Sequence, residues 1–140
     1  MSQTPIDVAL IADMLDLQKQ ERLPHAILLV APFGFALKGN AKAIAKSLLC
    51  QQQSANGCGA CKPCQAFENQ SHGDYRRLAQ AEGKASIGVD QVREACDFVA
   101  QTSGYGDLKL LIVDGADKMT VPAANALLKT LEEPGHGLLI

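Results

Sequence analysis

The chain of 140 residues contains no tryptophan, and aromatic residues make up only 4% of it. It also lacks an excess of one charge, because 13 basic and 15 acidic residues leave a formal net charge of −2. Proteins that hold nucleic acid unaided rely on basic grooves and on aromatic side chains that stack against bases. The composition therefore disfavours direct nucleic-acid binding, and we expect any role with DNA to be indirect.

The N-terminus lacks the charged start, apolar core and cleavage site of a signal peptide, and no apolar run is long enough to span a bilayer. We therefore expect a cytoplasmic protein with no membrane partner. A content of 47% hydrophobic residues supplies one core, which predicts a single domain over residues 1–140. Because the chain ends on the apolar run 137–140, we expect the N-terminal part of a longer protein, truncated at its C-terminal end.

The spacing of apolar residues predicts alternating helices and strands. The run 25–31 is continuously apolar and rich in branched side chains, so we expect it to be a buried, central strand. Cys96 falls on the apolar face of a predicted helix and is expected to be a buried packing residue. Together these elements predict an α/β domain with a parallel sheet flanked by helices. The predicted helices cover about residues 5–20, 41–49, 65–72, 89–99 and 122–133, and the predicted strands cover 25–31, 75–78 and 108–113.

Four of the five cysteines gather at one end of a polar stretch at about residues 50–72. In a reducing compartment, such a cluster is more typical of a metal site than of disulfides. Four thiolates satisfy a tetrahedral zinc ion completely and leave no position for water, so the ion would be structural. Residues 51–64 hold almost no large apolar side chains, and metal bonds would replace the core that they cannot build. The predicted ligands are Cys50, Cys58, Cys61 and Cys64.

Three other interpretations of these cysteines remain open. Cys58 and Cys61 have the spacing of a redox pair, although the two further cysteines argue against that role. The three-residue repeat also occurs in iron–sulfur proteins, but the C-x3-C-P element that accompanies it there is missing. The third interpretation is unligated surface cysteines. His72 could also replace one cysteine as a ligand, although a plain loop histidine is the simpler reading.

A working phosphate loop is missing from the turn after the first predicted strand. Such a loop reads G-x-x-x-x-G-K-[ST], in which glycines admit the phosphates, lysine neutralises them and the hydroxyl holds magnesium. Residues 31–38 keep only the central Gly34, with Leu37 at the lysine position and Lys38 at the hydroxyl position. A register that starts at Gly34 restores two glycines but supplies asparagine and alanine instead of lysine and a hydroxyl.

The second half of a nucleotide site is degenerate too. The apolar strand ends in Asp114, the magnesium position, but Gly115 stands where a glutamate would activate water. The loss of lysine, hydroxyl and glutamate removes charge neutralisation, metal ligation and water orientation. We therefore expect no ATP binding and no catalytic residue. Taken alone, the loop also fits a simple turn in an unrelated α/β protein.

Specific motifs carry a family resemblance. The stretch 124–134 is nearly identical to a signature of clamp-loader subunits, and residues 88–94, Asp74-Tyr75 and the four-cysteine insertion fit the same pattern. Over about residues 20–140, the chain resembles the AAA+ clamp-loader subunits of bacterial DNA polymerase III. Within this family the tau/gamma subunits keep an intact phosphate loop, whereas a non-catalytic stator subunit lacks one.

The resemblance implies a P-loop NTPase-like AAA+ domain with a small zinc-binding insertion, acting as a stator in the complex that loads the sliding clamp on primed DNA. It implies tau/gamma and delta subunits as partners, and the clamp and primer–template DNA through the complex. The chain would be a non-catalytic subunit of a DNA-directed DNA polymerase, a nucleotidyltransferase. An arginine offered to a neighbour's ATP is expected beyond Ile140, and none of Arg22, Arg76, Arg77 and Arg93 is assigned that role.

Two other functions stay open. An active ATPase of the tau/gamma type would need Lys38 to do the work of the missing lysine. A zinc ribbon that binds nucleic acid directly is disfavoured by the near-neutral charge and the few aromatic residues.

Overall fold

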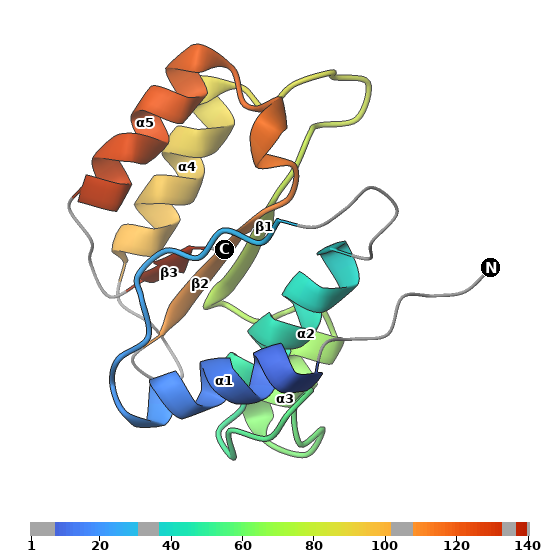
Figure 1. The fold of residues 1–140 in the computed structure, drawn as a ribbon. Coiled ribbons are helices and arrows are strands. Elements are labelled where there is room, and N and C mark those ends of the chain that lie inside the picture. Colours follow the sequence, from blue (N-terminus) through green and yellow to red (C-terminus); the bar gives the residue numbers. More distant parts are fainter. Residues whose placement is uncertain (1–7, 31–36, 102–107, 133–136, 140) are drawn as a thin grey trace. The chain divides into compact units, whose positions relative to one another are not determined.

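A computed structural model describes residues 8–30, 37–101, 108–132 and 137–139 (Figure 1). The chain divides into two units. The first comprises residues 1–24 and 28–72, and its described helices are joined by loops without a named strand. The second comprises residues 25–27 and 73–140, and it contains the sheet.

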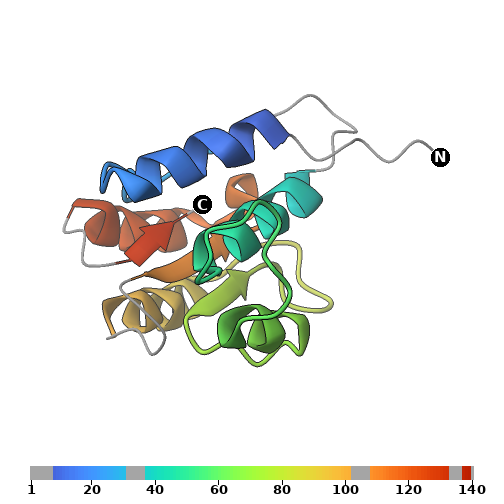
Figure 2. The same ribbon diagram turned by 90° about the horizontal axis from the view of Figure 1, so that it is seen from below.

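The sheet of the second unit is parallel throughout its described part. Strands β1 (Tyr75–Leu78), β2 (Lys109–Val113) and β3 (Gly137–Leu139) pair in the order β1-β2-β3. Helix α4 (Val89–Ala100) connects β1 to β2, and α5 (Val121–Glu132) connects β2 to β3. Figures 1 and 2 show α4 and α5 side by side over one face of the sheet. This arrangement follows from parallel pairing, which requires a long crossover between successive strands.

The core of the second unit lies between that face and the two helices. Leu111 on β2 and Ile87 before α4 have no exposed surface, and a 3-10 helix at Ala116–Lys118 leads from β2 toward α5. Apolar residues of α4 and α5 recur at helical spacing and complete the cluster. Its buried members are Leu78, Ile87, Val92, Ala95, Val99, Leu111, Ala123 and Leu127.

The first unit consists of α1 (Val8–Lys19), α2 (Leu37–Leu49) and α3 (Lys62–Glu68) in its described part. Helix α1 packs against α2 and buries Ile11 and Leu15, which lie one turn apart on the same face. The Gln18 side-chain amide donates a hydrogen bond of 2.8 Å to the carbonyl oxygen of Leu48. That bond satisfies a carbonyl in the last turn of α2, where helical partners run out.

The sequence-based predictions of a parallel α/β fold and of its later elements are confirmed. Strands β1 and β2 and helices α4 and α5 fall within one residue of their predicted limits, and α1 lies inside the predicted helix. Helix α3 begins three residues earlier and ends four residues earlier than predicted; its early start follows from Pro63 in the first turn, which already has the backbone angle that a helix needs. Cys96 packs against the core as predicted, but it is only partly buried.

The prediction of a buried central strand at 25–31 is wrong for the described residues 25–30. They form no named strand, only Ala26 makes a bridge, and Leu28 and Val30 are 76% and 81% exposed. Among the described strands the central one is β2, which has β1 and β3 on its two sides. An apolar run favours burial, but only a strand with a paired neighbour can bury its backbone groups.

None of the helices in the described residues is long and apolar enough to cross a lipid bilayer.

Candidate functional site

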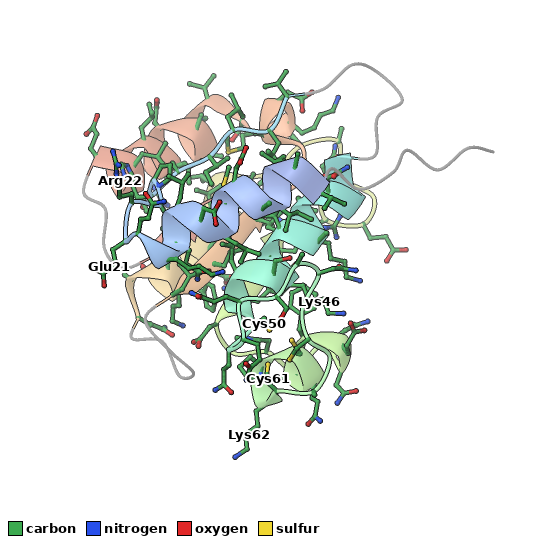
Figure 3. All side chains as sticks on the ribbon, turned by 60° about the horizontal axis from the view of Figure 1, so that its bottom comes forward. Glu21, Arg22, Lys46, Cys50, Cys61 and Lys62 are labelled. Atoms are coloured by element: carbon green, nitrogen blue, oxygen red, sulfur yellow. The ribbon has the colours of Figure 1, made fainter. Side chains whose placement is uncertain are left out.

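The four cysteine sulfurs of the first unit converge at one point. Cys50 directly follows α2, Cys58 lies in the connecting loop, Cys61 immediately precedes α3 and Cys64 lies in its first turn. All four sulfur atoms lie within 4.8 Å of one another. Figure 3 shows Cys50 and Cys61 directed toward a common point, with Lys62 pointing away from it.

These distances fit one tetrahedral ion. Four sulfurs at about 2.3 Å from a zinc ion would be roughly 3.8 Å apart. The Cys58 and Cys64 sulfurs are 3.9 Å apart, and those of Cys61 and Cys50 are 4.0 Å apart. All five cysteines are free thiols, and the described ligand cluster contains the four predicted cysteines without His72. The residues present therefore fit a structural metal ion of the zinc type.

Backbone N–H groups already point at the sulfurs that a metal would need as thiolates. The N–H groups of Ala60 and Cys61 donate to the Cys58 sulfur at 3.4 and 3.3 Å. These bonds lower the pKa of the Cys58 thiol to about 6, since they stabilise the charged form. The Cys58 N–H also donates to the Cys50 sulfur at 3.3 Å. The loop therefore directs backbone donors at the sulfurs of Cys58 and Cys50, where they favour the charged form of each thiol.

The two buried cysteines differ in the balance of burial and hydrogen bonding. Burial raises the pKa of the Cys64 thiol to about 12, and backbone hydrogen bonds offset only part of that effect. Burial also acts on Cys50, but backbone donors that include Ser54 and Cys58 outweigh it and lower the pKa of that thiol. A divalent ion deprotonates coordinating thiols outright. Its positive charge would therefore stabilise the thiolate of Cys64, which burial otherwise disfavours.

Side chains of α2 and α3 brace the loop that bears Cys58. The buried Ser47 hydroxyl donates to the Ala43 carbonyl oxygen at 2.7 Å and accepts the Asn56 N–H at 2.6 Å, which ties the loop to α2. The Lys46 ammonium group on α2 forms an ion pair with Glu68 on α3. Because Cys50 follows α2 and Cys64 lies on α3, this pair helps to fix the spacing of two ligands.

Gly57 lies close to both the Lys46 stem and the cluster. Its backbone is in the left-handed region, with φ of +77°, and a β-carbon built there would be 3.0 Å from the Cε of Lys46 and 3.1 Å from the Cys64 sulfur. Gly59 has nearly the same backbone angle, +75°, but no atom lies within 4 Å of such a β-carbon. A β-carbon would therefore meet the same backbone strain at both glycines, but only at Gly57 would it also press on the Lys46 stem and the Cys64 sulfur.

Gly57→Ala is expected to weaken zinc affinity by on the order of tenfold, whereas Gly59→Ala is expected to have a smaller effect. Either substitution adds left-handed strain of about 1–2 kcal/mol, and only the first also presses a methyl group against the Cys64 sulfur. Competition with a chromophoric chelator measures the affinities, with circular dichroism as a check on folding. Equal losses in the two variants would contradict the proposed contact.

The phosphate-loop region is described only at its edges. Gly34 lies outside the described residues, and the side chains of Leu37 and Lys38, at the start of α2, also fall outside them. Asp114 directly follows β2, and its N–H donates to the Leu78 carbonyl oxygen at 2.8 Å. Gly115 has φ of +82°, so the glycine at the glutamate position turns the chain into the 3-10 helix.

The Asp114 carboxylate is not open to solvent on all sides. It accepts a hydrogen bond from the Arg77 guanidinium group on the neighbouring strand, and the two side chains are about one-third exposed, at 33% and 39%. The sequence alone does not identify Arg77, Ser47 or Gly57 as site residues. The spacing of β1 and β2 in the sequence does not reveal their register, which is what pairs Arg77 with Asp114.

Comparisons with known proteins extend over nearly the whole chain. A family model described as DNA polymerase III, delta subunit, matches residues 7–140. DNA polymerase III subunit delta' of Pseudomonas aeruginosa is 46% identical over 111 residues, which cover 79% of this chain and 34% of that protein. The corresponding subunit of Haemophilus influenzae is 43% identical over 110 residues, 79% of this chain and 33% of that protein.

A subunit of another kind is similar at lower identity. DNA polymerase III subunit gamma/tau of Mycobacterium bovis is 33% identical over 119 residues, covering 84% of this chain and 20% of that protein. The chain spans about a third of the length of the delta' relatives that it matches.

Proposed function

Because the chain belongs to the DNA polymerase III delta subunit family, we propose that it is the N-terminal AAA+ part of a non-catalytic delta' subunit of a clamp loader. The resemblance to clamp-loader subunits that the motifs indicate is confirmed by the family match and by the delta' relatives. In this role the subunit is a stator: it helps to assemble the complex that loads a sliding clamp on primed DNA. The proposed domain covers residues 1–140, with a zinc module at about 50–72.

The main support for a non-catalytic role is that the phosphate loop lacks the residues that bind phosphate and magnesium. Leu37 replaces the lysine that neutralises phosphates, and Lys38 replaces the hydroxyl that holds magnesium. Gly115 replaces the glutamate that would orient water. Identity to delta' subunits of 43% and 46%, against 33% to a gamma/tau subunit, favours the same choice.

The proposed partners are those that the resemblance to clamp-loader subunits implies. We infer that tau/gamma and delta subunits bind this protein directly, and that the sliding clamp and primer–template DNA meet it through the complex. The proposed location is the cytoplasm, where reduced cysteines favour metal binding over disulfides. A structural zinc ion would hold the loop at 50–64 in shape and would take no part in a reaction, because four thiolates leave no open position.

The purified protein is expected to bind no ATP in the presence of magnesium, and Lys38→Ala is expected to change nothing. Isothermal titration measures binding, and phosphate release measures turnover. In a mixture with cognate tau/gamma and delta subunits, the protein should co-elute with them in gel filtration. The rate of ATP hydrolysis by that mixture should be the same with Lys38→Ala as with the unaltered protein. Micromolar ATP binding with turnover by the protein alone would instead favour an active ATPase of the tau/gamma type.

A further inference from the structure

The alternation of side chains along β1 places Arg77 on the sheet face away from α4 and α5. Its neighbours Arg76 and Leu78 point toward those helices: the Arg76 guanidinium carbon is 5.3 Å from the Phe98 ring centroid on α4, and Leu78 belongs to the core cluster. Successive residues of a strand point to opposite faces. Arg77 therefore lies on the other face, close to the carboxyl end of β1.

Strand β2 brings Asp114 to the same face. Lys109 and Leu111 point toward α4, because the Lys109 ammonium nitrogen is 4.1 Å from the Phe98 ring centroid and Leu111 is in the core cluster. Asp114 lies three positions after Leu111, an odd offset, so alternation directs it to the opposite face. Its N–H bond to the Leu78 carbonyl extends the ladder by one residue, which keeps that alternation intact.

The register of β1 and β2 explains why the side chains of Arg77 and Asp114 lie close together. Arg77 is paired with Ile112, and Leu78 is paired with Val113. Asp114 follows β2 directly, so its partner position on the neighbouring chain segment is residue 79. Arg77 lies two residues before that position, and its long side chain can reach the Asp114 carboxylate diagonally. The ion pair between Arg77 and Asp114 is thus a product of the sheet and not of a loop.

Asp114 directly follows a strand of the parallel sheet, and in phosphate-loop proteins an aspartate at the corresponding position holds magnesium. Ligands of open parallel sheets bind at the carboxyl ends of the strands, and an aspartate there binds Mg²⁺ in active members. A guanidinium group is always charged and offers five donors, so it satisfies a carboxylate without a metal. Mg²⁺ requires octahedral oxygen ligation and retains water, and here it would have to displace the guanidinium group first.

We propose that Arg77 is a resident cation that occupies the Asp114 carboxylate in place of a divalent metal ion. The inference rests on the proposed function, since Asp114 is a metal position only in a phosphate-loop fold. Arg77 is a specificity-determining residue: it excludes magnesium by a route independent of Leu37. Repair of the loop sequence alone would therefore leave the metal position blocked.

Paramagnetic Mn²⁺ at millimolar concentration tests this role in the intact protein by NMR. The amide signals of residues 113–115 should keep their intensity in the unaltered protein and broaden selectively in Arg77→Met. The broadening should disappear in Arg77→Met/Asp114→Asn, and Arg77→Lys should behave like the unaltered protein. Arg77→Gln serves in place of Arg77→Met if that variant does not fold, because it keeps a polar end without the charge.

Two results would overturn the role of Arg77. One is equal broadening in the unaltered protein and in Arg77→Met, and the other is no broadening in either neutral variant. Both can be told apart from a failure of the proposed function, which would appear as ATP turnover by the unaltered protein and by the Arg77 variants alike.

Discussion

Removal of the proposed zinc ion from the purified protein is expected to unfold residues 50–68 and to leave the sheet unit folded. No residue from 51 to 61 is buried, so this stretch has little apolar surface with which to hold its shape. Structural zinc contributes about 10–16 kcal/mol in zinc-finger peptides at neutral pH, far more than a few loop hydrogen bonds provide. Elemental analysis should find one equivalent of zinc, and hydrogen exchange should show protection of α3 lost after chelation.

Cysteine variants supply the control for this experiment. Cys58→Ser and Cys64→Ser should each lower the zinc content and the protection of α3, because each removes one of the four converging sulfurs. Cys96→Ser should retain both, since Cys96 lies on α4 and outside the cluster. Unchanged exchange at α3 after complete removal of zinc would contradict a structural metal, and it would favour the interpretation as unligated thiols.

The candidate metal site shows which features can be predicted from the spacing of residues in the sequence and which cannot. The repeat at Cys58, Cys61 and Cys64 predicts convergence because a short loop and one helical turn cannot carry these sulfurs far apart. Cys50 belongs to the cluster only because α2 ends beside the loop. The brace at Ser47 could not be predicted in this way, since a serine within a helix usually faces solvent or its own backbone. Its second bond, to Asn56, exists only in the folded loop.

The sheet shows the corresponding limit for the fold. Lys109–Val113 could be predicted as a strand because it is a short run dominated by apolar, branched side chains and ends at turn residues. The run 25–30 has the same composition, yet Leu28 and Val30 are exposed. Composition indicates which segments would gain from burial, but pairing partners decide which of them are buried. The register that joins Arg77 to Asp114 depends on pairing in the same way.

A second large effect is expected from Lys109→Met. Lys109 and Asp74 form an ion pair at 3.9 Å, and their side chains are only 6% and 4% exposed. The Lys109 ammonium nitrogen also lies 4.1 Å from the Phe98 ring centroid, so one cation serves two partners. Its removal would leave the buried Asp74 carboxylate without its ion pair, which costs about 3–5 kcal/mol. For a chain of this size the unfolding midpoint should fall by on the order of 10 °C.

The double variant Lys109→Met/Asp74→Asn should be more stable than Lys109→Met alone, because it also neutralises the buried Asp74 carboxylate whose ion-pair partner Lys109→Met removes. Replacement of a buried pair by neutral groups is often close to neutral, whereas removal of one partner is not. Arg93→Met is the matched control: Arg93 and Asp90 are paired at 3.6 Å, but their side chains are 68% and 94% exposed, so the midpoint should not move measurably. Calorimetry of the four proteins checks the order. Equal midpoints for Lys109→Met and Arg93→Met would mean that burial adds nothing to the pair, and that the start of β2 is held by its ladder and its apolar neighbours instead.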